Sequence, residues 1–537
     1  MCCDTVREQN SIKTTSVYIG CMNILRKSAL CTALTALLAT SVSYAQDLRL
    51  KVVPFPEDAI PLQVYRSAQT GPYIVNWQVI KGTGLVVECY DVESGALAGR
   101  SIMDWNDDLM ALETFLPWNG RYYMIKAIEN ETSKKMNVVA QAYSLPDWTP
   151  QGEAITLIND LDAELKSLPV SNFYESSGPT DAQSGASTDQ RESSRATRLG
   201  IALHRSADDE HLLITHFATS KTMSRAYHME GWVYNKQLAP VQHFAKDLMH
   251  CGHGMDPFLR SVLVHTDGTV HMLVCTKENG EKEAEHAYKH IIRISDGQAH
   301  VVALKPAGDA DLLGVDMAYV GDRIHLVGFY GTGKADETQG TCSAYIPLDV
   351  DGPVSIELHP FEKPLVQYNA AKLMYRAGGD HYLIGDNQQR ETFQSDSEET
   401  IVITFDKGHN TQWSTVIPRA PIQNMTAGRG YLVMDAEGGP VLFLSDIEEN
   451  LALRSAGKKL KRTTYVLQTL MVRFDEAGSP SFSMLGAPDH MVDRSDLAPS
   501  QDGRFLYARV RPAFTSAVQY MRSKYSLGIL DLFPSSR

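Results

Sequence analysis

The chain has 537 residues, of which 43% are hydrophobic and 21% are charged, and its formal net charge at pH 7 is −14. This balance is typical of a globular protein that buries a core. The excess of acidic residues argues against a nucleic-acid partner, because phosphate binding depends on clustered Lys and Arg.

The N-terminus has the pattern of a signal peptide over residues 22–45. A short basic region that starts at Met22 is followed by the apolar stretch Leu30–Val42 and by a small-x-small cleavage motif that ends at Ala45. We interpret residues 1–21 as an upstream extension and Met22 as the start. No later run approaches the roughly 18 apolar residues of a spanning helix, so we expect no transmembrane segment after cleavage. The mature chain is expected in the periplasm, outside the cell or at the outer membrane.

The stretch Ile401–Ile417 is typical of a β-hairpin, because two runs rich in β-branched and aromatic residues flank an Asp-Lys-Gly turn. The same design, a large apolar residue at a strand end followed by a polar turn residue, occurs eight times along the chain. The turn residues are Asp91, Ser144, Asn235, Ser295, Asp349, Asp406, Asp475 and Asp531. A recurring unit of this size indicates an array or a propeller.

Each repeated unit also predicts four short strands. In the sixth unit these strands cover residues 372–376, 380–385, 399–405 and 412–417. Four strands per unit without helices are typical of a propeller blade. We therefore expect an all-β fold, with a single β-propeller domain of four-stranded antiparallel blades over residues 46–537. The expected number of blades is eight, or seven if the first unit is not a full blade.

Three segments depart from the repeat. Residues 171–197 are rich in Ser, Gly, Thr and Asp, with almost no large apolar residue, and predict a disordered insertion. Just before them, Leu157–Leu168 has a weak helical pattern that predicts one short surface helix. Asn450–Arg462 lengthens the loop between the second and third strands of the seventh unit.

The two ends of the domain predict a closed ring. Six residues follow Asp531, so the last unit lacks a fourth strand, whereas Asp47–Val53 is a strand without a partner in its own unit. Pairing this strand with the last unit would remove the exposed edges of both.

One hairpin carries a family resemblance. Leu497–Tyr507, with its Ser-Gln-Asp-Gly-Arg-Phe-Leu-Tyr run, resembles the first hairpin of the TolB and YVTN/lactonase-type repeats of bacterial exported β-propeller proteins. Ser206–Asp209, which precedes His211–Ile214, is a looser match to the same hairpin. The resemblance covers two of the repeated units, and it implies the fold and hardly anything about activity.

The densest group of metal-ligand residue types contains His250, Cys251 and His253. Imidazole and thiolate bind zinc or copper, and the intervening glycines would let the backbone fold round an ion. The spacing matches no zinc motif, and the favoured interpretation is a structural loop. In that interpretation Cys251 forms a disulfide with Cys275, which ends a second strand that returns to the same face.

Two further groups lie in connections between blades, on the face where ligand sites of propellers usually lie. The first group comprises Asp104, Trp105, Asp107 and Asp108. Its carboxylates and its ring would suit Ca²⁺ or a sugar. In the second group Asp489 and His490 could orient a general base, although no nucleophile is recognisable. A solvated turn or loop is the favoured interpretation of both groups.

These patterns favour an exported, non-enzymatic binding or scaffold module for a protein or glycan ligand. The alternative is a propeller enzyme of the lactonase or glycoside-processing type that uses carboxylates or a metal at the central channel. The sequence specifies no cofactor and no oligomeric state. It places any site in the unrepeated loops, away from the eight repeated turns.

Overall fold

The structure is a computed structural model, and the residues that it describes all lie in one compact unit, Leu50–Arg537. The described residues are 51–54, 68–70, 72–80, 83–91, 94–105, 110–162, 201–219, 226–249, 258–275, 290–308, 310–332, 337–366, 368, 370–376, 379–386, 399–420, 431–436, 439–461, 468–485, 490–499, 505–512 and 526–531.

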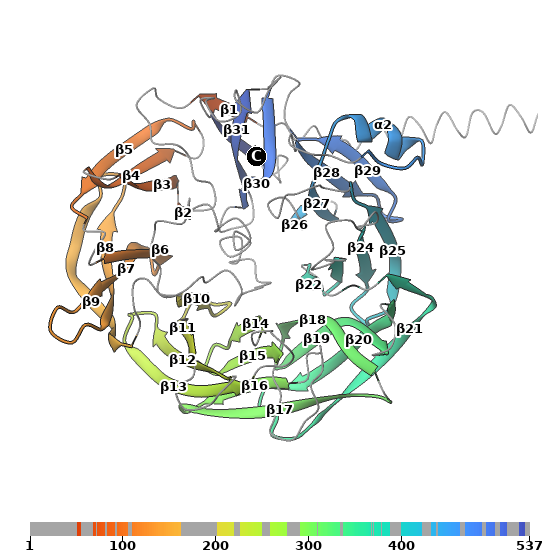
Figure 1. The fold of residues 1–537 in the computed structure, drawn as a ribbon, viewed down its shortest axis with the longest axis horizontal. Coiled ribbons are helices and arrows are strands. Elements are labelled where there is room, and N and C mark those ends of the chain that lie inside the picture. The colour runs from red at the N-terminus through yellow and green to blue at the C-terminus, as the bar shows by residue number, and fades with distance from the viewer. Residues whose placement is uncertain are drawn as a thin grey trace, which may run out of the picture. The chain divides into compact units, whose positions relative to one another are not determined.

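Three four-stranded antiparallel sheets come first, each with its strands in sequence order (Figure 1). The first is formed by β2 (Ala68–Thr70), β3 (Tyr73–Ile80), β4 (Gly84–Asp91) and β5 (Leu97–Met103). The second is formed by β6 (Met110–Trp118), β7 (Arg121–Glu129), β8 (Met136–Ser144) and β9 (Thr149–Leu161). The third is formed by β10 (Ile201–Arg205), β11 (His211–Thr219), β12 (Ala226–Asn235) and β13 (Pro240–Met249).

An eight-stranded sheet follows, in the order β14-β15-β16-β17-β21-β20-β19-β18. Its first half is formed by β14 (Phe258–Val264), β15 (Val270–Cys275), β16 (His290–Ser295) and β17 (Gln298–Pro306). Its second half is formed by β18 (Ala310–Val320), β19 (Arg323–Thr332), β20 (Glu337–Pro347) and β21 (Val354–Val366). The halves join through parallel pairing of β17 with β21, in which Leu304 pairs with Val354.

Three more four-stranded antiparallel sheets complete the described fold. One is formed by β22 (Ala370–Tyr375), β23 (His381–Asp386), β24 (Glu399–Phe405) and β25 (Thr411–Pro418). The next is formed by β26 (Leu432–Ala436), β27 (Gly439–Asp446), β28 (Gln468–Phe474) and β29 (Pro480–Met484). The last has the order β1-β32-β31-β30 and is formed by β30 (His490–Pro499), β31 (Phe505–Pro512), β32 (Ser526–Asp531) and β1 (Lys51–Pro54).

The sheets follow one another round a propeller-like ring (Figure 1), so the all-β expectation is confirmed. The predicted number of eight separate blades, or seven, each of four strands, is not confirmed. Within the described ranges the strands form six four-stranded sheets and one eight-stranded sheet. The first unit, which looked weakest in the sequence, has its own four-stranded sheet. The difference arises because the parallel pairing of β17 with β21 merges the fourth and fifth units.

The predicted closure of the ring is confirmed by the pairing of the first described strand with the last. Antiparallel pairing joins Lys51 of β1 to Ile529 of β32, and Val53 to Leu527. This pairing gives the last unit its fourth strand and leaves neither β1 nor β32 as a single unpaired strand.

The hydrophobic core lies between consecutive sheets. One cluster packs Val327 and Phe329 of β19 against Leu383 of β23 and Ile401 and Ile403 of β24. Other clusters join the β6–β9 sheet to the β10–β13 sheet and the β22–β25 sheet to the β26–β29 sheet. Because both faces of a sheet are covered in this way, strands such as β23 are buried along their whole length.

The predicted surface helix is wrong over its first part, because Leu157–Leu161 belongs to β9. The irregular pairing of β9 with β8 buries Leu157, Ile158 and Leu161, a spacing that a helix would also give. Residues 163–168 and the predicted insertion at 171–197 lie outside the described residues. The predicted lengthening between β27 and β28 contains α2 (Glu449–Ser455), and no helix in the described parts of the chain is long and apolar enough to span a membrane.

The repeated turn residues have the local role that the sequence predicts. Each lies at or just beyond the end of a unit's third strand, and four of them accept hydrogen bonds from main-chain N–H groups of their own turns. These four are Asp91, Asn235, Asp406 and Asp475. The two hairpins that carry the family resemblance also form, as β30 with β31 and as β10 with β11.

Candidate metal centre

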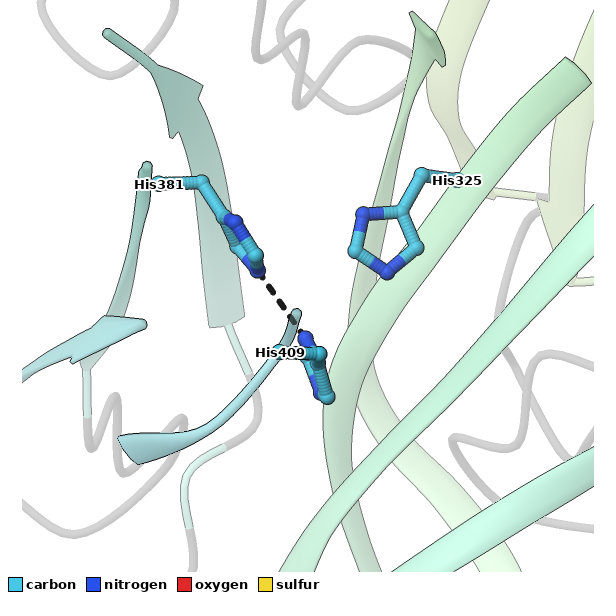
Figure 2. Close-up of side chains that lie close together, drawn as sticks. All are labelled: His325, His381 and His409. Carbon is cyan, nitrogen blue, oxygen red and sulfur yellow. Dashed lines mark hydrogen bonds between the residues drawn. The ribbon is translucent and has the colours of Figure 1, made fainter. Parts of the chain in front are cut away.

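Three histidines from two neighbouring sheets converge at one end of their strands (Figure 2). His325 lies near the start of β19 in the eight-stranded sheet, and His381 is the first residue of β23 in the next sheet. His409 lies in the turn that joins β24 to β25. Strand register explains the meeting, because His381 pairs with Phe405, four residues before His409. All three are therefore at the end that carries the turns between third and fourth strands, whereas the sequence predicts any site away from those turns.

One nitrogen of each imidazole lies within 4.8 Å of the corresponding nitrogens of the other two. The Nε2 atom of His381 and the Nδ1 atom of His409 are 2.9 Å apart and share a hydrogen bond (Figure 2). Zn–N bonds of about 2.0–2.1 Å in a tetrahedral site would place ligand nitrogens roughly 3.3 Å apart. Small side-chain shifts would therefore bring these three nitrogens round one ion.

The hydrogen bonds of the ring nitrogens determine which of them are available to a ligand. The Nδ1 atom of His325 forms a hydrogen bond with the hydroxyl of Tyr375. Among the described residues, the buried Nε2 atoms of His325 and His409 have no hydrogen-bond partner. A buried polar atom without a partner costs free energy, and such atoms are uncommon in folded proteins. His325 and His409 each therefore have one ring nitrogen that a ligand could use.

Aromatic rings hold the imidazoles in place. The ring of His409 stacks on Phe405 with centroids 4.4 Å apart and an angle of 5° between the planes. The ring of His325 stacks on Tyr345 at 4.2 Å and 4°. Tyr345 is 45% exposed, whereas His325 and His381 are buried and His409 is half-buried. Stacking restricts each imidazole before any ligand arrives.

Burial keeps the three imidazoles neutral, which is the form that binds metals. Burial lowers the pKa of His325 to about 3, with a smaller contribution from repulsion by His381 and His409 in their protonated forms. Burial and then the charges of His381 and His359 lower the pKa of His409 to about 4. Burial also lowers the pKa of His381, partly offset by the Gly379 backbone and nearby carboxylates. Proton competition with a metal is therefore weak at neutral pH.

His409 has a left-handed backbone with φ of +62°, as does Leu238, with φ of +60°, at the same place in the turn between β12 and β13. The corresponding turn of the next sheet has Gly478 in this place, with φ of +79°. His409 donates its N–H to the carbonyl of Asp406, and Gly478 donates its N–H to the carbonyl of Asp475. Left-handed backbone costs a residue with a Cβ free energy, and the tight turn imposes that cost with or without a ligand.

A fourth imidazole lies beside the cluster. His359 of β21 has its ring centroid 5.3 Å from that of His409, and its Nε2 is 3.0 Å from the hydroxyl of Ser343. It is too far away to count among the three convergent ligands. Its ring contacts that of His409 while its Nε2 has a partner in Ser343, so it lies beside the cluster without belonging to it.

The site residues predicted from sequence fall mostly outside the described residues. His250, Cys251, His253, Asp107, Asp108 and Asp489 are among these. Cys275 ends β15 and His490 begins β30, but their side chains are not described. The predicted metal loop, the disulfide and the Asp489–His490 pair therefore stay predictions.

Two predicted ligand residues are described. Asp104 is exposed, and Trp105 is half-buried and packs against the core between the first two sheets. A Trp that covers the core has less of its face available for a sugar, which favours the structural interpretation of that residue.

The histidine cluster was missed because its members are 28 to 84 residues apart in the sequence and come together through strand register. The signal that could have found part of it was the pairing of the strands at 380–385 and 399–405, which places His381 beside the turn that holds His409. His290, another histidine without a chemical motif around it, is buried in β16.

No family model matches the chain, and no curated protein matches it by sequence. Among solved structures, it is similar to a prolyl endopeptidase at 9% identity and a TM-score of 0.34, over 95% of this chain and 61% of that one. The β-propeller domain of the Trilobed protease from Pyrococcus furiosus matches at 9% identity and a TM-score of 0.31, over 79% of this chain and 93% of that one. An exo-β-1,3-galactanase from Clostridium thermocellum matches at 11% identity and a TM-score of 0.26, over 61% of this chain and 74% of that one.

These similarities are too slight to carry an argument about activity. The propeller assignment rests on the strand order, and the candidate site rests on its own geometry.

Proposed function

We propose that this chain is an exported β-propeller binding module whose ligand is a divalent late transition metal ion. The observation that supports this proposal is the convergence of His325, His381 and His409, with one nitrogen of each within 4.8 Å of the others. The buried, unpartnered Nε2 atoms of His325 and His409 support it further.

The chemistry of the ligands narrows the metal. Imidazole nitrogen suits Zn²⁺, Cu²⁺, Ni²⁺ and Co²⁺, whereas Mg²⁺ and Ca²⁺ prefer oxygen ligands. All three convergent groups are imidazoles, so we propose Zn²⁺ as the physiological ion and expect Cu²⁺ to bind as well or better in vitro.

The proposed ion would join two sheets, because His325 belongs to one sheet and His381 and His409 to the next. A ligand that binds the folded state alone stabilises it by RT ln(1 + [L]/Kd), about 2.7 kcal/mol at a free concentration 100 times Kd. Zinc should therefore raise the melting temperature of the protein, and a chelator should reverse the change.

An enzyme remains the second candidate function, and the number of ligands favours it. Catalytic zinc sites usually have three protein ligands and a water in the fourth position, and the metal lowers the pKa of that water to about 7. In this proposal His359 would contact the water. Zinc-dependent hydrolysis of lactones or aryl esters, lost on His325→Ala, would support the enzyme over the plain binding module.

Export and a macromolecular ligand belong to the same proposal. We propose cleavage after Ala45, location in the periplasm, outside the cell or at the outer membrane, and a protein or glycan partner at the loops between units. Expression from Met22, followed by fractionation and N-terminal sequencing of the mature chain, tests the first part. A mature chain that begins at Gln46 is expected, and an uncleaved chain in the cytoplasm would contradict it.

Isothermal titration of the metal-free mature protein with Zn²⁺ tests metal binding. One strong site is expected, which His381→Ala should weaken at least 100-fold. Two further variants, His250→Ala and His253→Ala, distinguish this cluster from the metal loop predicted from sequence. Loss of zinc on either of those changes, with retention in His381→Ala, would assign the metal to the loop and overturn the proposed site.

A further inference from the structure

We infer that Tyr375 is a positioning residue for this metal site, which it serves by setting the tautomer of His325. The inference rests on the proposed function, because it concerns how the same histidines bind an ion.

The two ring nitrogens of His325 have different surroundings. The Nδ1 atom forms its hydrogen bond with the hydroxyl of Tyr375, while the buried Nε2 atom has no partner in the described part of the chain. Nε2 is therefore the atom that is open to an ion. A neutral imidazole carries one proton, so Nε2 can donate its lone pair to a metal when that proton is on Nδ1.

A proton on Nδ1 needs an acceptor in this buried place. The oxygen of Tyr375 is the printed partner of Nδ1, and a phenol can accept as well as donate a hydrogen bond. In the metal-bound form Nδ1–H of His325 would donate to that oxygen. Metal-binding histidines generally use their second nitrogen in this way, and the partner fixes both the tautomer and the ring orientation.

Strand pairing and ring stacking fix the position of Tyr375 beside His325. It is the last residue of β22 and pairs in register with His381 of β23. Its ring also stacks on that of His381, with centroids 5.1 Å apart and an angle of 28° between the planes. One side chain thus contacts two of the three proposed ligands, one from each sheet.

A second tyrosine–histidine pair, Tyr319 and His271, serves as a control because both ring nitrogens of its histidine have hydrogen-bond partners. His271, near the start of β15, has its Nδ1 atom 3.0 Å from the hydroxyl of Tyr319, near the end of β18. Its Nε2 atom is 3.0 Å from the carbonyl oxygen of Leu348. A carbonyl can only accept, so His271 must carry its proton on Nε2, and Tyr319 must donate to Nδ1. The same tyrosine–histidine contact is therefore purely structural there.

The test compares Tyr375→Phe with Tyr319→Phe in the mature chain. Each change removes a tyrosine hydroxyl that forms a hydrogen bond with a histidine of a neighbouring unit. Each should therefore lower stability to a similar extent. We expect Tyr375→Phe to weaken Zn²⁺ binding 10- to 100-fold, the range typical of lost outer-shell partners, and Tyr319→Phe to leave the affinity unchanged.

A spectroscopic measurement separates positioning from general destabilisation. Electron paramagnetic resonance of the Cu²⁺-loaded protein should give hyperfine coupling to three nitrogens in the original chain and in Tyr319→Phe. In Tyr375→Phe the coupling should fall to two nitrogens, because His325 no longer presents Nε2.

The outcomes distinguish the inference from the function on which it rests. If the original chain binds neither Zn²⁺ nor Cu²⁺, the proposed function fails and the inference fails with it. If the original chain binds and Tyr375→Phe keeps the same affinity and the same three-nitrogen spectrum, the inference alone is overturned. Equal losses of affinity in the two tyrosine variants would also overturn it, since they would indicate a structural effect.

Discussion

Two properties of His409 bear on its role. It has a left-handed backbone where the corresponding turn has Gly478, and its buried Nε2 atom has no partner among the described residues. Both properties raise the free energy of the folded state. Leu238 has the same backbone conformation in the equivalent turn and carries no ligand atom, so the unpartnered Nε2 is the property that ligand binding would explain.

Replacing His409 by glycine therefore separates function from stability. His409→Gly relieves a left-handed conformation, worth about 1–2 kcal/mol, and loses stacking on Phe405, worth about 0.5–1.5 kcal/mol. We expect the free energy of unfolding to change by no more than about 1 kcal/mol, while zinc affinity falls at least 100-fold. Urea denaturation and zinc titration measure the two effects. Unchanged zinc affinity would exclude His409 as a ligand.

A buried histidine outside the cluster should make the fold sensitive to acid. Burial lowers the pKa of His204 to about 4 from its ordinary value of 6.5. Between those pH values the unfolded chain binds a proton that the folded chain does not, so this contribution to stability is complete above pH 6.5 and declines as the pH falls towards 4.

Removing that group should flatten the pH dependence. At about 1.4 kcal/mol per pKa unit, His204 accounts for at most roughly 3 kcal/mol of the loss. We expect His204→Gln to lower stability at pH 7.5 but to lose less on acidification, as measured by urea denaturation at pH 7.5, 6 and 5. If both proteins lose the same free energy of unfolding on acidification, His204 binds its proton in the folded state as readily as in the unfolded chain.

At the scale of the element, the β24–β25 turn holds one proposed ligand. Asp406 accepts hydrogen bonds from the N–H groups of Gly408 and Asn410 and so fixes the turn that contains His409. Asp475 fixes the β28–β29 turn in the same way, through Ala477 and Ser479, but that turn contains no histidine.

The two aspartates therefore form a test and its control. Asp406→Ala and Asp475→Ala should each cost about 1–2 kcal/mol of stability, because each leaves main-chain N–H groups with fewer partners. Asp406→Ala alone should weaken zinc binding, by roughly tenfold. Thermal denaturation and zinc titration of both variants provide the comparison. Similar affinities in the two variants would show that the turn does not position His409.

The strands were predictable because each unit repeats its own local signals. The run at 399–405 and the Asp-Lys-Gly turn after it specify β24 and its hairpin without reference to the rest of the chain. The β17–β21 pairing was not predictable in this way, since Leu304 and Val354 are 50 residues apart and neither strand signals a parallel partner. The histidine cluster depends on the same kind of long-range contact, between β19 and β23.

At the scale of the whole molecule, the pairing of β1 with β32 completes the last sheet. We expect deletion of residues 46–54 to lower the melting temperature and to promote association, because β32 would become an open edge. Deletion of residues 46–49 leaves β1 intact and is the control. Calorimetry and analytical ultracentrifugation give the two readouts, and equal behaviour of the two deletions would mean that closure by β1 contributes little.

In the proposed function one ion joins two sheets of the ring. Crystals of the mature protein soaked in Zn²⁺, with diffraction recorded on either side of the zinc absorption edge, test it most directly. The expected result is one strong anomalous peak with His325, His381 and His409 nitrogens at about 2.0–2.1 Å. A strong peak at another site, or none at this cluster at zinc concentrations that saturate the protein in solution, would contradict the claim.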